Sequence, residues 1–354
     1  MAATIKDIAN RTGLGLATIS KYLNGGNVLP KNRDAIEAAI SELDYQPNSF
    51  ARGLKTKRSK VIGVVLPEIN NAFLMQFLTE MEYNLKRKDY AIFVSDCHND
   101  KIKEIEAVNF LLSKGVDGII SVPLSRSGKH LQSAFAQNVP VLLIDRAIPA
   151  LSRKVDSITI DNEAISYEAV QGQIITKGHR RIGIVTGPEG TYTADRRLLG
   201  YHNALVDSGL GADPELVWRG DYTVEGGVAG YKALIAKNPD MTAIFATNHY
   251  TTMGVLMAIN EERKRIPTDI SILGFDAMDW LQIVNPPLTI VEQPMQEIGR
   301  LAAEILMRRL LNKDDMPKQS IKLSAKLHIG ESIGTVKTAQ RSRADKRRRN
   351  IASL

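Results

Sequence analysis

Polar residues stand directly after several apolar runs of the chain, where they could bind a small molecule. These residues are Asp145, Arg146, Asp161, Asn162, Asn248 and Asp276. If the runs are strands of open parallel sheets, their carboxyl ends are where ligands bind. An Asp or Asn after a strand can also cap the next helix. The residues alone leave both interpretations open.

The sequence lacks the common motifs of catalytic and metal sites. It has no Gly-x-Gly-x-x-Gly after a strand, no Walker loop and no Gly-x-Ser-x-Gly elbow, and the loop 187–190 is a weak phosphate signal. The six histidines show no His-x-x-x-His or Glu-x-x-His spacing. We therefore expect no enzyme, no cofactor and no metal site.

Residues 4 to 23 have the pattern of a DNA-binding unit. Thr4 and Asp7 can form a capping box at the start of one short helix, Gly13 permits a tight turn, and Leu16–Leu23 forms a second helix with Ile19 on its buried side. Two short helices joined by a glycine turn make a helix-turn-helix, whose second helix can lie in the DNA major groove. A small helical cap without a DNA role is the alternative.

The second helix carries the side chains that we expect to read DNA. Leu16, Ala17 and Lys21 are expected to face the bases. Phosphate contacts or caps are expected from Thr18, Ser20 and Asn24, and Thr4 is also assigned to the DNA surface. A third helix follows Pro30.

From Val61 onward, short apolar runs alternate with amphipathic stretches. Val61–Leu66 is expected to be a buried strand, followed by a helix whose buried stripe is Leu74, Leu78, Met81 and Leu85. Further strands are expected at 91–94, 118–122, 141–145, 158–161, 181–185, 243–246 and 270–276. Further helices are expected around Ile105, Val108 and Leu112, around Leu131 and Phe135, up to about Lys177, and over 197–208 and 251–263. This alternation predicts an α/β core of two doubly wound parallel sheets.

Charge is concentrated at the two ends of the chain. Residues 1–60 carry ten Lys/Arg against five Asp/Glu, a net +5, and residues 337–354 carry seven against one, a net +6. The 276 residues between them carry a net −4. Basic ends on a nearly neutral body favour a polyanionic partner. The single cysteine, Cys97, excludes an intrachain disulfide. With no visible leader and no apolar run of about 20 residues, we expect a cytoplasmic protein without a membrane span.

The N-terminal region closely resembles the LacI family of bacterial transcriptional regulators. The resemblance lies in Ile5-Lys-Asp-Ile8-Ala9, Gly13, Ala17-Thr18-Ile19-Ser20-Lys21, Leu23-Asn24 and the hinge pattern Tyr45-x-Pro47-Asn48-x-x-Ala51-Arg52-x-Leu54. It implies that the hinge, through Asn48, Ala51, Arg52 and Leu54, also contacts DNA. A Leu54 pair would wedge into the minor groove. Lys21 stands where Arg is commoner in the family, and Gly15 replaces the usual capping Ser.

The resemblance extends to about residue 336 and implies the domain organisation. A headpiece of residues 1–46 and a hinge of residues 47–60 precede a periplasmic-binding-protein-like core of residues 61–336. The chain would cross between its lobes near Asp161, Thr289 and Leu323. The N-lobe would comprise about 61–161 and 291–322, and the C-lobe about 162–290 and 323–336. The basic tail, 337–354, is expected to be disordered. It has no leucine heptads, so we expect a homodimer rather than a tetramer.

The resemblance also assigns an effector site between the lobes. Arg197 would clamp the ligand, Tyr222 would stack on it and Asp276 would accept from its hydroxyl groups or base nitrogens. The full expected set is Phe73, Asp145, Thr193, Arg197, Tyr222, Asn248, Asp276 and Gln293. A plain ion pair between Arg197 and Asp276 is the alternative. His249 stands where the family commonly has Asp.

These expectations combine into one function. The chain would repress carbohydrate-utilisation genes by binding a pseudo-palindromic operator as a dimer, and a sugar or sugar acid would release it. The alternatives are a corepressor-dependent or phosphoprotein-dependent regulator, or a cytoplasmic sugar-binding protein.

Overall fold

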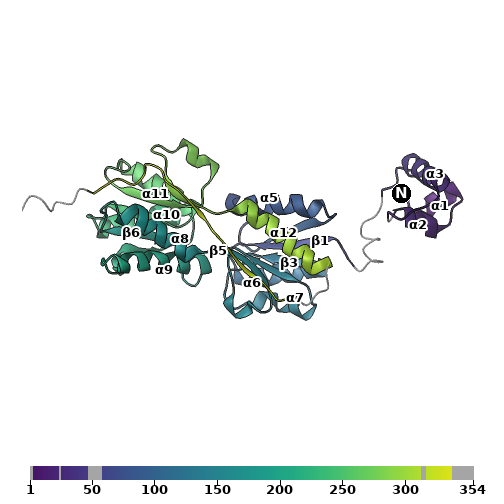
Figure 1. Cartoon of the computed structure of the whole chain (residues 1–354), viewed down its shortest axis with the longest axis horizontal. Helices are drawn as coiled ribbons and strands as arrows, with labels where there is room; N and C mark the ends of the chain where they lie inside the picture. Colours follow the sequence, from purple (N-terminus) through teal and green to yellow (C-terminus); the bar gives the residue numbers. More distant parts are fainter. Residues whose placement is uncertain (1–2, 24, 47–57, 312–315, 337–354) are drawn as a thin grey trace, which may run out of the picture. The chain divides into compact units, whose positions relative to one another are not determined.

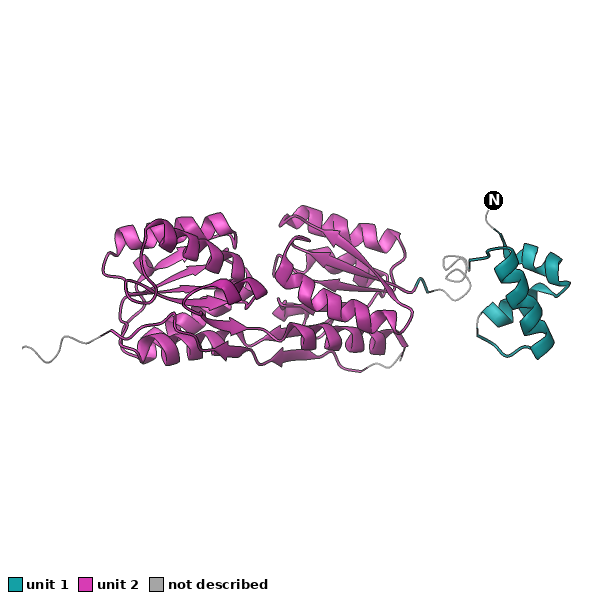
Figure 2. Ribbon diagram, turned by 90° about the horizontal axis from the view of Figure 1, so that it is seen from above, with its two compact units in different colours: residues 1–59 teal, residues 60–354 magenta. Residues whose placement is uncertain are grey.

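The chain divides into two compact units, residues 1–59 and 60–354 (Figure 2). A computed structural model of the protein describes residues 3–23, 25–46, 58–311 and 316–336. The hinge residues Asn48, Ala51, Arg52 and Leu54, the residue Asn24 and the basic tail 337–354 lie outside the described residues.

The first unit is the predicted helix-turn-helix headpiece. Its helices are α1 (Ile5–Thr12), α2 (Leu16–Leu23) and α3 (Pro30–Glu42), and their buried side chains are Ile8, Ile19, Ile36 and Ala39. The Asp7 carboxylate accepts from the backbone N–H of Thr4 at 2.8 Å, which is the half of the predicted capping box that closes back on the N-cap. Gly13 ends α1 with a φ of 69°, in the left-handed region that glycine tolerates.

The second unit contains two six-stranded sheets, one in each lobe. The first has the order β11-β5-β4-β3-β1-β2, and every pair in it is parallel. Its strands are β1 (Val61–Leu66), β2 (Ala91–Asp96), β3 (Gly118–Ser121), β4 (Val141–Ile144), β5 (Asp156–Ile160) and β11 (Ser320–Leu323). Two lobes of parallel sheet confirm the predicted fold class.

The second sheet has the order β12-β10-β9-β8-β6-β7. Its strands are β6 (Ile182–Thr186), β7 (Val217–Arg219), β8 (Ala243–Ala246), β9 (Ser271–Phe275), β10 (Thr289–Glu292) and β12 (Lys326–His328). Only β12, an edge strand, runs antiparallel to its neighbour among the pairs of described residues.

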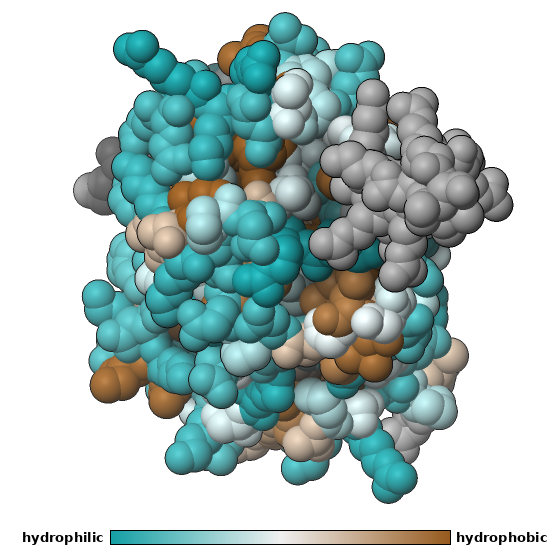
Figure 3. Space-filling model, turned by 90° about the vertical axis from the view of Figure 1, so that its left-hand side faces the viewer, coloured by the Kyte–Doolittle hydropathy of each residue, from teal (hydrophilic) through white to brown (hydrophobic). Residues whose placement is uncertain are grey.

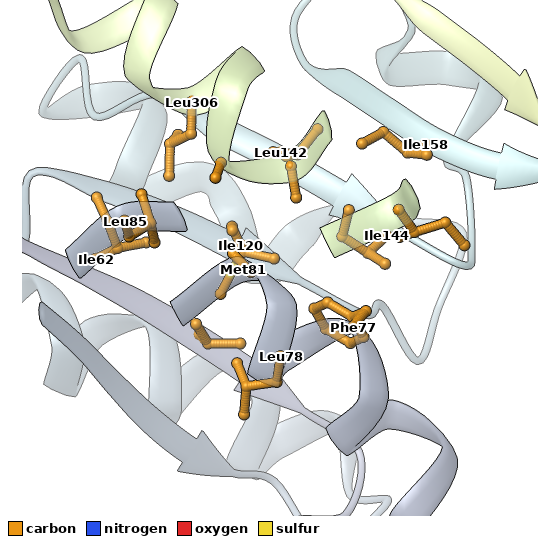
Figure 4. Close-up of a cluster of buried hydrophobic side chains, with 14 of the residues drawn as sticks. Ile62, Phe77, Leu78, Met81, Leu85, Ile120, Leu142, Ile144, Ile158 and Leu306 are labelled. Carbon is orange, nitrogen blue, oxygen red and sulfur yellow. The ribbon is translucent and has the colours of Figure 1, made fainter. Parts of the chain in front are cut away.

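Helices cover both faces of the first sheet. Helices α5 (Ala72–Lys86) and α12 (Met295–Leu311) lie side by side on one face (Figure 1), although more than 200 residues separate them in the chain. Their side chains, such as Phe77, Met81 and Leu306, pack against Ile62 and Ile120 (Figure 4). On the opposite face, α6 (Lys101–Ser113) packs against the alternate strand residues. Burial on both faces explains why the strands read as continuous apolar runs.

The second sheet is covered in the same way. Helices α8 (Asn162–Ala169) and α9 (Tyr192–Asp207), with the π-helical turn Val170–Ile175, pack on one face. Helices α10 (Val224–Lys237) and α11 (His249–Glu261) pack on the other. The outer end of this lobe carries mostly hydrophilic side chains, with hydrophobic ones in separate groups (Figure 3). Among the described residues, no helix is long and apolar enough to cross a membrane.

Several predicted details differ in the structure. Of the residues named for the predicted helix α6, Val108 and Leu112 are buried, but Ile105 is 38% exposed, and Leu111 packs inward as well. Helix α11 begins at His249 rather than at 251, because the Asn248 side chain caps it by accepting from Thr251 N at 2.8 Å. Helix α9 also begins earlier than predicted, at Tyr192. Strands β7, β10, β11 and β12 and helices α10 and α12 were not predicted from the periodicity.

The chain crosses between the lobes three times. The first crossing is at Asp161, between β5 and α8, and the third lies between Leu323 and Lys326. The second was expected near Thr289, but it falls at Gln293 and Pro294. Thr289 cannot mark it, because β10 pairs in parallel with β9 as a strand of the second sheet.

Candidate functional site

A cleft of about 630 Å³ opens between the two lobes of the core. Both lobes contribute the loops that follow the carboxyl ends of their strands. The residues at these ends include Pro67, Leu124 and Asp145 in the first lobe and Pro188, Asp221, Asn248 and Asp276 in the second. This is the position at which open parallel sheets bind ligands.

The cleft brings together seven of the eight side chains predicted for the effector site. They are Phe73, Asp145, Thr193, Arg197, Tyr222, Asn248 and Asp276. The eighth, Gln293, does not line the cleft but lies behind it, and its Nε2 donates to Asp276 Oδ1 at 2.7 Å. Gln293 thus holds a cleft residue. The role of the set in binding stays a prediction.

Arg197, near the N-terminal end of helix α9, is held in one orientation. Its side chain is 3% exposed, its Nε donates to Asn162 Oδ1 at 2.7 Å and its Nη1 donates to the carbonyl of Thr247 at 2.5 Å. The guanidinium also lies 3.7 Å from the centre of the Phe275 ring, a cation–π contact. Its nearest approach to Asp276 is 3.8 Å, from Nη1 to Oδ2. The guanidinium is therefore a fixed donor that does not depend on Asp276 for its position.

Two carboxylates face the cleft from opposite lobes. Burial raises the pKa of Asp145, the charges of Arg146 and Arg197 lower it, and the negative charge of Asp276 raises it further. Burial also raises the pKa of Asp276, against the lowering effect of Arg197 and of the hydrogen bonds from Gln293 and from the backbone of His249. A pair of desolvated acids next to fixed arginines is the kind of perturbed group that marks functional sites.

Three cleft residues have left-handed backbone conformations. Asp145, Tyr222 and Asp276 have φ values of 65°, 68° and 68°. Each such conformation in a non-glycine residue costs on the order of 1–3 kcal/mol, and such strain concentrates at ligand sites. Gly187 has a related role, because a Cβ at that position would overlap the Tyr222 ring. These backbone conformations therefore lower the stability of the fold while they place the three side chains at the cleft.

His249 and Arg126 are among the cleft residues that were not predicted as binding residues. His249 lines the cleft as the first residue of α11, with 3% of its surface exposed. Arg126 reaches the cleft from the loop after β3, and its Nη2 lies 2.6 Å from Asp195 Oδ2 of the other lobe. The cap at Asn248 could have drawn attention to His249, but no local signal pairs Arg126 with a residue 69 positions away.

The headpiece presents the predicted DNA-facing side chains at its surface. Leu16, Ala17 and Lys21 are exposed on α2, and the side chain of Leu16 is 46% exposed although it is large and apolar. Thr18 is half-buried, and with Ala17 and Lys21 it lines a groove against the start of α3. Ser20 is half-buried and Thr4 is exposed. Ile19 points into the core, so the opposite face of α2 is free to meet DNA.

Within the described ranges, no group of three or more His, Cys, Asp or Glu residues could bind a metal ion.

Comparisons with known proteins agree with this arrangement. The family model described as bacterial regulatory proteins, lacI family, matches residues 4–48, and the model of a periplasmic binding protein-like domain matches residues 172–333. Catabolite control protein A of Priestia megaterium is 32% identical over 334 residues, which is 94% of this chain and 99% of the relative. The ribose operon repressor of Haemophilus influenzae is 30% identical over 314 residues, 88% of this chain and 93% of the relative.

A solved structure of a similar regulator covers both the headpiece and the core. The complex of the transcriptional regulator CelR with cellobiose superposes with a TM-score of 0.72 at 28% identity, and covers 93% of this chain and 99% of that one. The headpiece, the two-lobed core and relatives of this length at 30–32% identity lead to one conclusion. The chain belongs to the LacI family, as a helix-turn-helix DNA-binding transcriptional regulator.

Proposed function

We propose that this regulator represses genes of carbohydrate use by binding a pseudo-palindromic operator as a homodimer, and that a small sugar or sugar acid bound in the interlobe cleft releases it. The observation that carries the proposal is the cleft itself. It lies at the strand ends of two lobes and combines a fixed guanidinium, two buried carboxylates and the Tyr222 ring. Carboxylate acceptors, arginine donors and an aromatic face are the groups that bind the hydroxyls and the apolar face of a sugar.

The names of similar proteins support the sugar class. One relative is a ribose operon repressor, and one similar regulator was solved with cellobiose. A corepressor-dependent or phosphoprotein-dependent regulator is the second candidate function, and one relative is named for catabolite control.

The proposed mechanism links the cleft to the headpiece through the lobes. Each protomer of the dimer inserts α2 into a major groove, and the Leu54 pair wedges into the minor groove between the half-sites. A ligand that contacts both lobes stabilises one angle between them. It shifts the operator equilibrium by the difference between its affinities for the two states. The lobes already touch at the cleft through Arg126 and Asp195 and through Tyr250, whose hydroxyl donates to the carbonyl of Asn70 at 3.2 Å.

The full-length protein tests the proposal with a duplex selected from a random DNA pool. Binding, measured by fluorescence anisotropy, should weaken steeply as salt rises, because phosphate contacts release counterions. Added ribose or cellobiose should release the duplex, and the sugar should be recovered unchanged. Sedimentation of the complex should show two protein chains on each duplex.

Matched variants separate the DNA surface from the cleft. Lys21→Ala should weaken duplex binding while leaving sugar binding unchanged. Lys88→Ala, which removes an exposed lysine of the core, should alter neither. A log–log salt plot that is nearly flat, or consumption of the sugar, would rule the proposal out.

A further inference from the structure

His249 is a buried polar side chain in the cleft whose two ring nitrogens have no hydrogen-bond partner among the described residues. It is 3% exposed and lines the cleft. Leaving a buried polar group without a partner destabilises the folded state, so native proteins nearly always satisfy such groups.

Another histidine of the same lobe shows the usual arrangement. His179 is equally buried, but its Nδ1 lies 2.9 Å from Thr242 Oγ1 and its Nε2 lies 3.0 Å from the carbonyl of Gly334. His179 therefore ties three segments of the fold together. His249 is as buried as His179 but makes no side-chain hydrogen bond to the described residues. Unlike His179, it lines the cleft.

The ring of His249 is held in place by aromatic neighbours. Its centroid is 4.0 Å from that of Tyr250 and 6.0 Å from that of Phe73, which belongs to the other lobe. Its backbone N–H donates to the carboxylate of Asp276. The side chain thus stands next to the predicted ligand contacts of both lobes, with its orientation fixed by packing rather than by hydrogen bonds.

The protonation state of His249 and the charges that line the cleft limit the chemical class of the ligand. Burial lowers the pKa of His249 to about 4, and the charge of Arg197 lowers it as well. At neutral pH the ring is uncharged and offers one donor and one acceptor. The buried or half-buried charged residues that line the cleft are two arginines, Arg146 and Arg197, and three acids, Glu68, Asp145 and Asp276. An anion would meet three carboxylates there without a surplus of positive charge.

We propose that His249 hydrogen-bonds a hydroxyl group of an uncharged polyhydroxylated ligand in the cleft. The inference rests on the proposed function and deepens it, because it excludes sugar acids and sugar phosphates and adds a specificity-determining residue. A hydroxyl group suits a neutral imidazole, since it can accept from one ring nitrogen or donate to the other.

The first test needs no ligand. His249→Phe fills the aromatic pocket and removes the unpartnered nitrogens, so the melting temperature of the ligand-free protein should rise by at least about 2 °C. The matched change His179→Phe should lower it, because that ring is fully hydrogen-bonded. A lower melting temperature for His249→Phe would show that the ring stabilises the fold, and would overturn the proposal.

The second test titrates the same proteins by calorimetry with ribose, cellobiose, gluconate and glucose 6-phosphate. Wild type should bind one of the two uncharged sugars, and His249→Phe should bind it at least about tenfold more weakly. His249→Gln, which keeps a donor and an acceptor, should recover part of the affinity. Binding of the selected DNA duplex should remain within twofold of wild type in both variants, as a check of the fold.

Each result leads to a distinct conclusion. Unchanged sugar affinity in His249→Phe overturns the role of His249 but leaves the proposed function intact. Wild type that binds only gluconate or glucose 6-phosphate overturns the uncharged class. Wild type that binds none of the four overturns the sugar effector itself, and the inference about His249 with it.

Discussion

At the scale of single residues, two buried charged side chains of the cleft are held in fixed positions. Arg197 is fixed by Asn162 and the carbonyl of Thr247, while Asp276 is oriented by Gln293. The two charges are therefore positioned separately and stand 3.8 Å apart. This geometry favours the ligand-clamp hypothesis over a plain ion pair, because Arg197 and Asp276 are each oriented by hydrogen bonds to other residues and not by each other.

The substitution Asp276→Asn distinguishes these two interpretations. If Asp276 binds a sugar hydroxyl, the Asp276→Asn variant should bind the sugar that wild type binds about ten- to a hundredfold more weakly. This is the effect of losing a charged hydrogen bond. The melting temperature should hold, because burial already raises the pKa of this carboxyl and the neutral amide avoids that desolvation. Calorimetry and a thermal melt measure the two effects. A lower melting temperature with unchanged affinity would favour the ion pair.

At the scale of elements, helix α6 fixes a loop that lines the cleft. Glu104 Oε1 accepts from the backbone N–H of Leu124 at 2.7 Å, just after β3, and Glu104 Oε2 lies 3.4 Å from His130 Nδ1. Burial raises the pKa of Glu104 from its ordinary 4.5 to about 7, and burial lowers that of His130 to about 4. The helix thus anchors the loop with an acid whose ionised form is disfavoured in the folded protein.

Glu104→Gln should therefore stabilise the protein in a pH-dependent way. The folded wild type binds a proton at Glu104 up to about pH 7, whereas the unfolded chain loses it near 4.5, so wild-type stability falls as pH rises between these values. Above pH 7 the variant should be more stable by on the order of 2–3 kcal/mol, and below pH 4.5 the difference should vanish. Urea unfolding at several pH values measures it. Glu106→Gln, on the exposed side of α6, controls for the lost charge, and an equal effect there would refute the explanation.

At the scale of the whole core, an ion pair joins the lobes across the cleft. Arg126 of the first lobe contacts Asp195 of the second at 2.6 Å, and Arg219 contacts the same carboxylate at 2.8 Å. The Arg126 side chain is 50% exposed, so the pair contributes at most about 1 kcal/mol to folding. Because this ion pair joins the two lobes, its energy can nevertheless favour one angle between the lobes over another.

Breaking this pair should weaken sugar binding without destabilising the fold. Arg126→Ala and Asp195→Asn should each lower affinity by up to about fivefold and leave the melting temperature within a degree or two. Arg300→Ala, which removes an exposed pair within helix α12, should change neither quantity. Asp195 does not line the cleft, so a loss confined to Arg126→Ala would mean direct contact with the ligand rather than a bridge between lobes.

The sequence alone predicted the headpiece helices and most of the strands and helices between Val61 and Asp276, in the right order. Capping at Thr4, the glycine turn at Gly13 and the buried position of Ile19 are local signals, because helix ends and helix faces depend on residues a few positions apart. Continuous apolar strands likewise predicted sheets buried on both faces. The effector residues were predicted from family resemblance and from their placement after strands, and the cleft brings seven of the eight together.

Only the tertiary structure decided which of these groups act on one another. Gln293 behind Asp276, Arg126 opposite Asp195 and Glu104 beside His130 are pairs separated by 17 to 69 residues, and no local pattern encodes such contacts. The second crossing was expected near Thr289 from the family resemblance, and only the pairing of β10 with β9 places it at Gln293 and Pro294. The unpartnered ring of His249 also required coordinates, since satisfaction of a buried polar atom depends on every segment that packs around it.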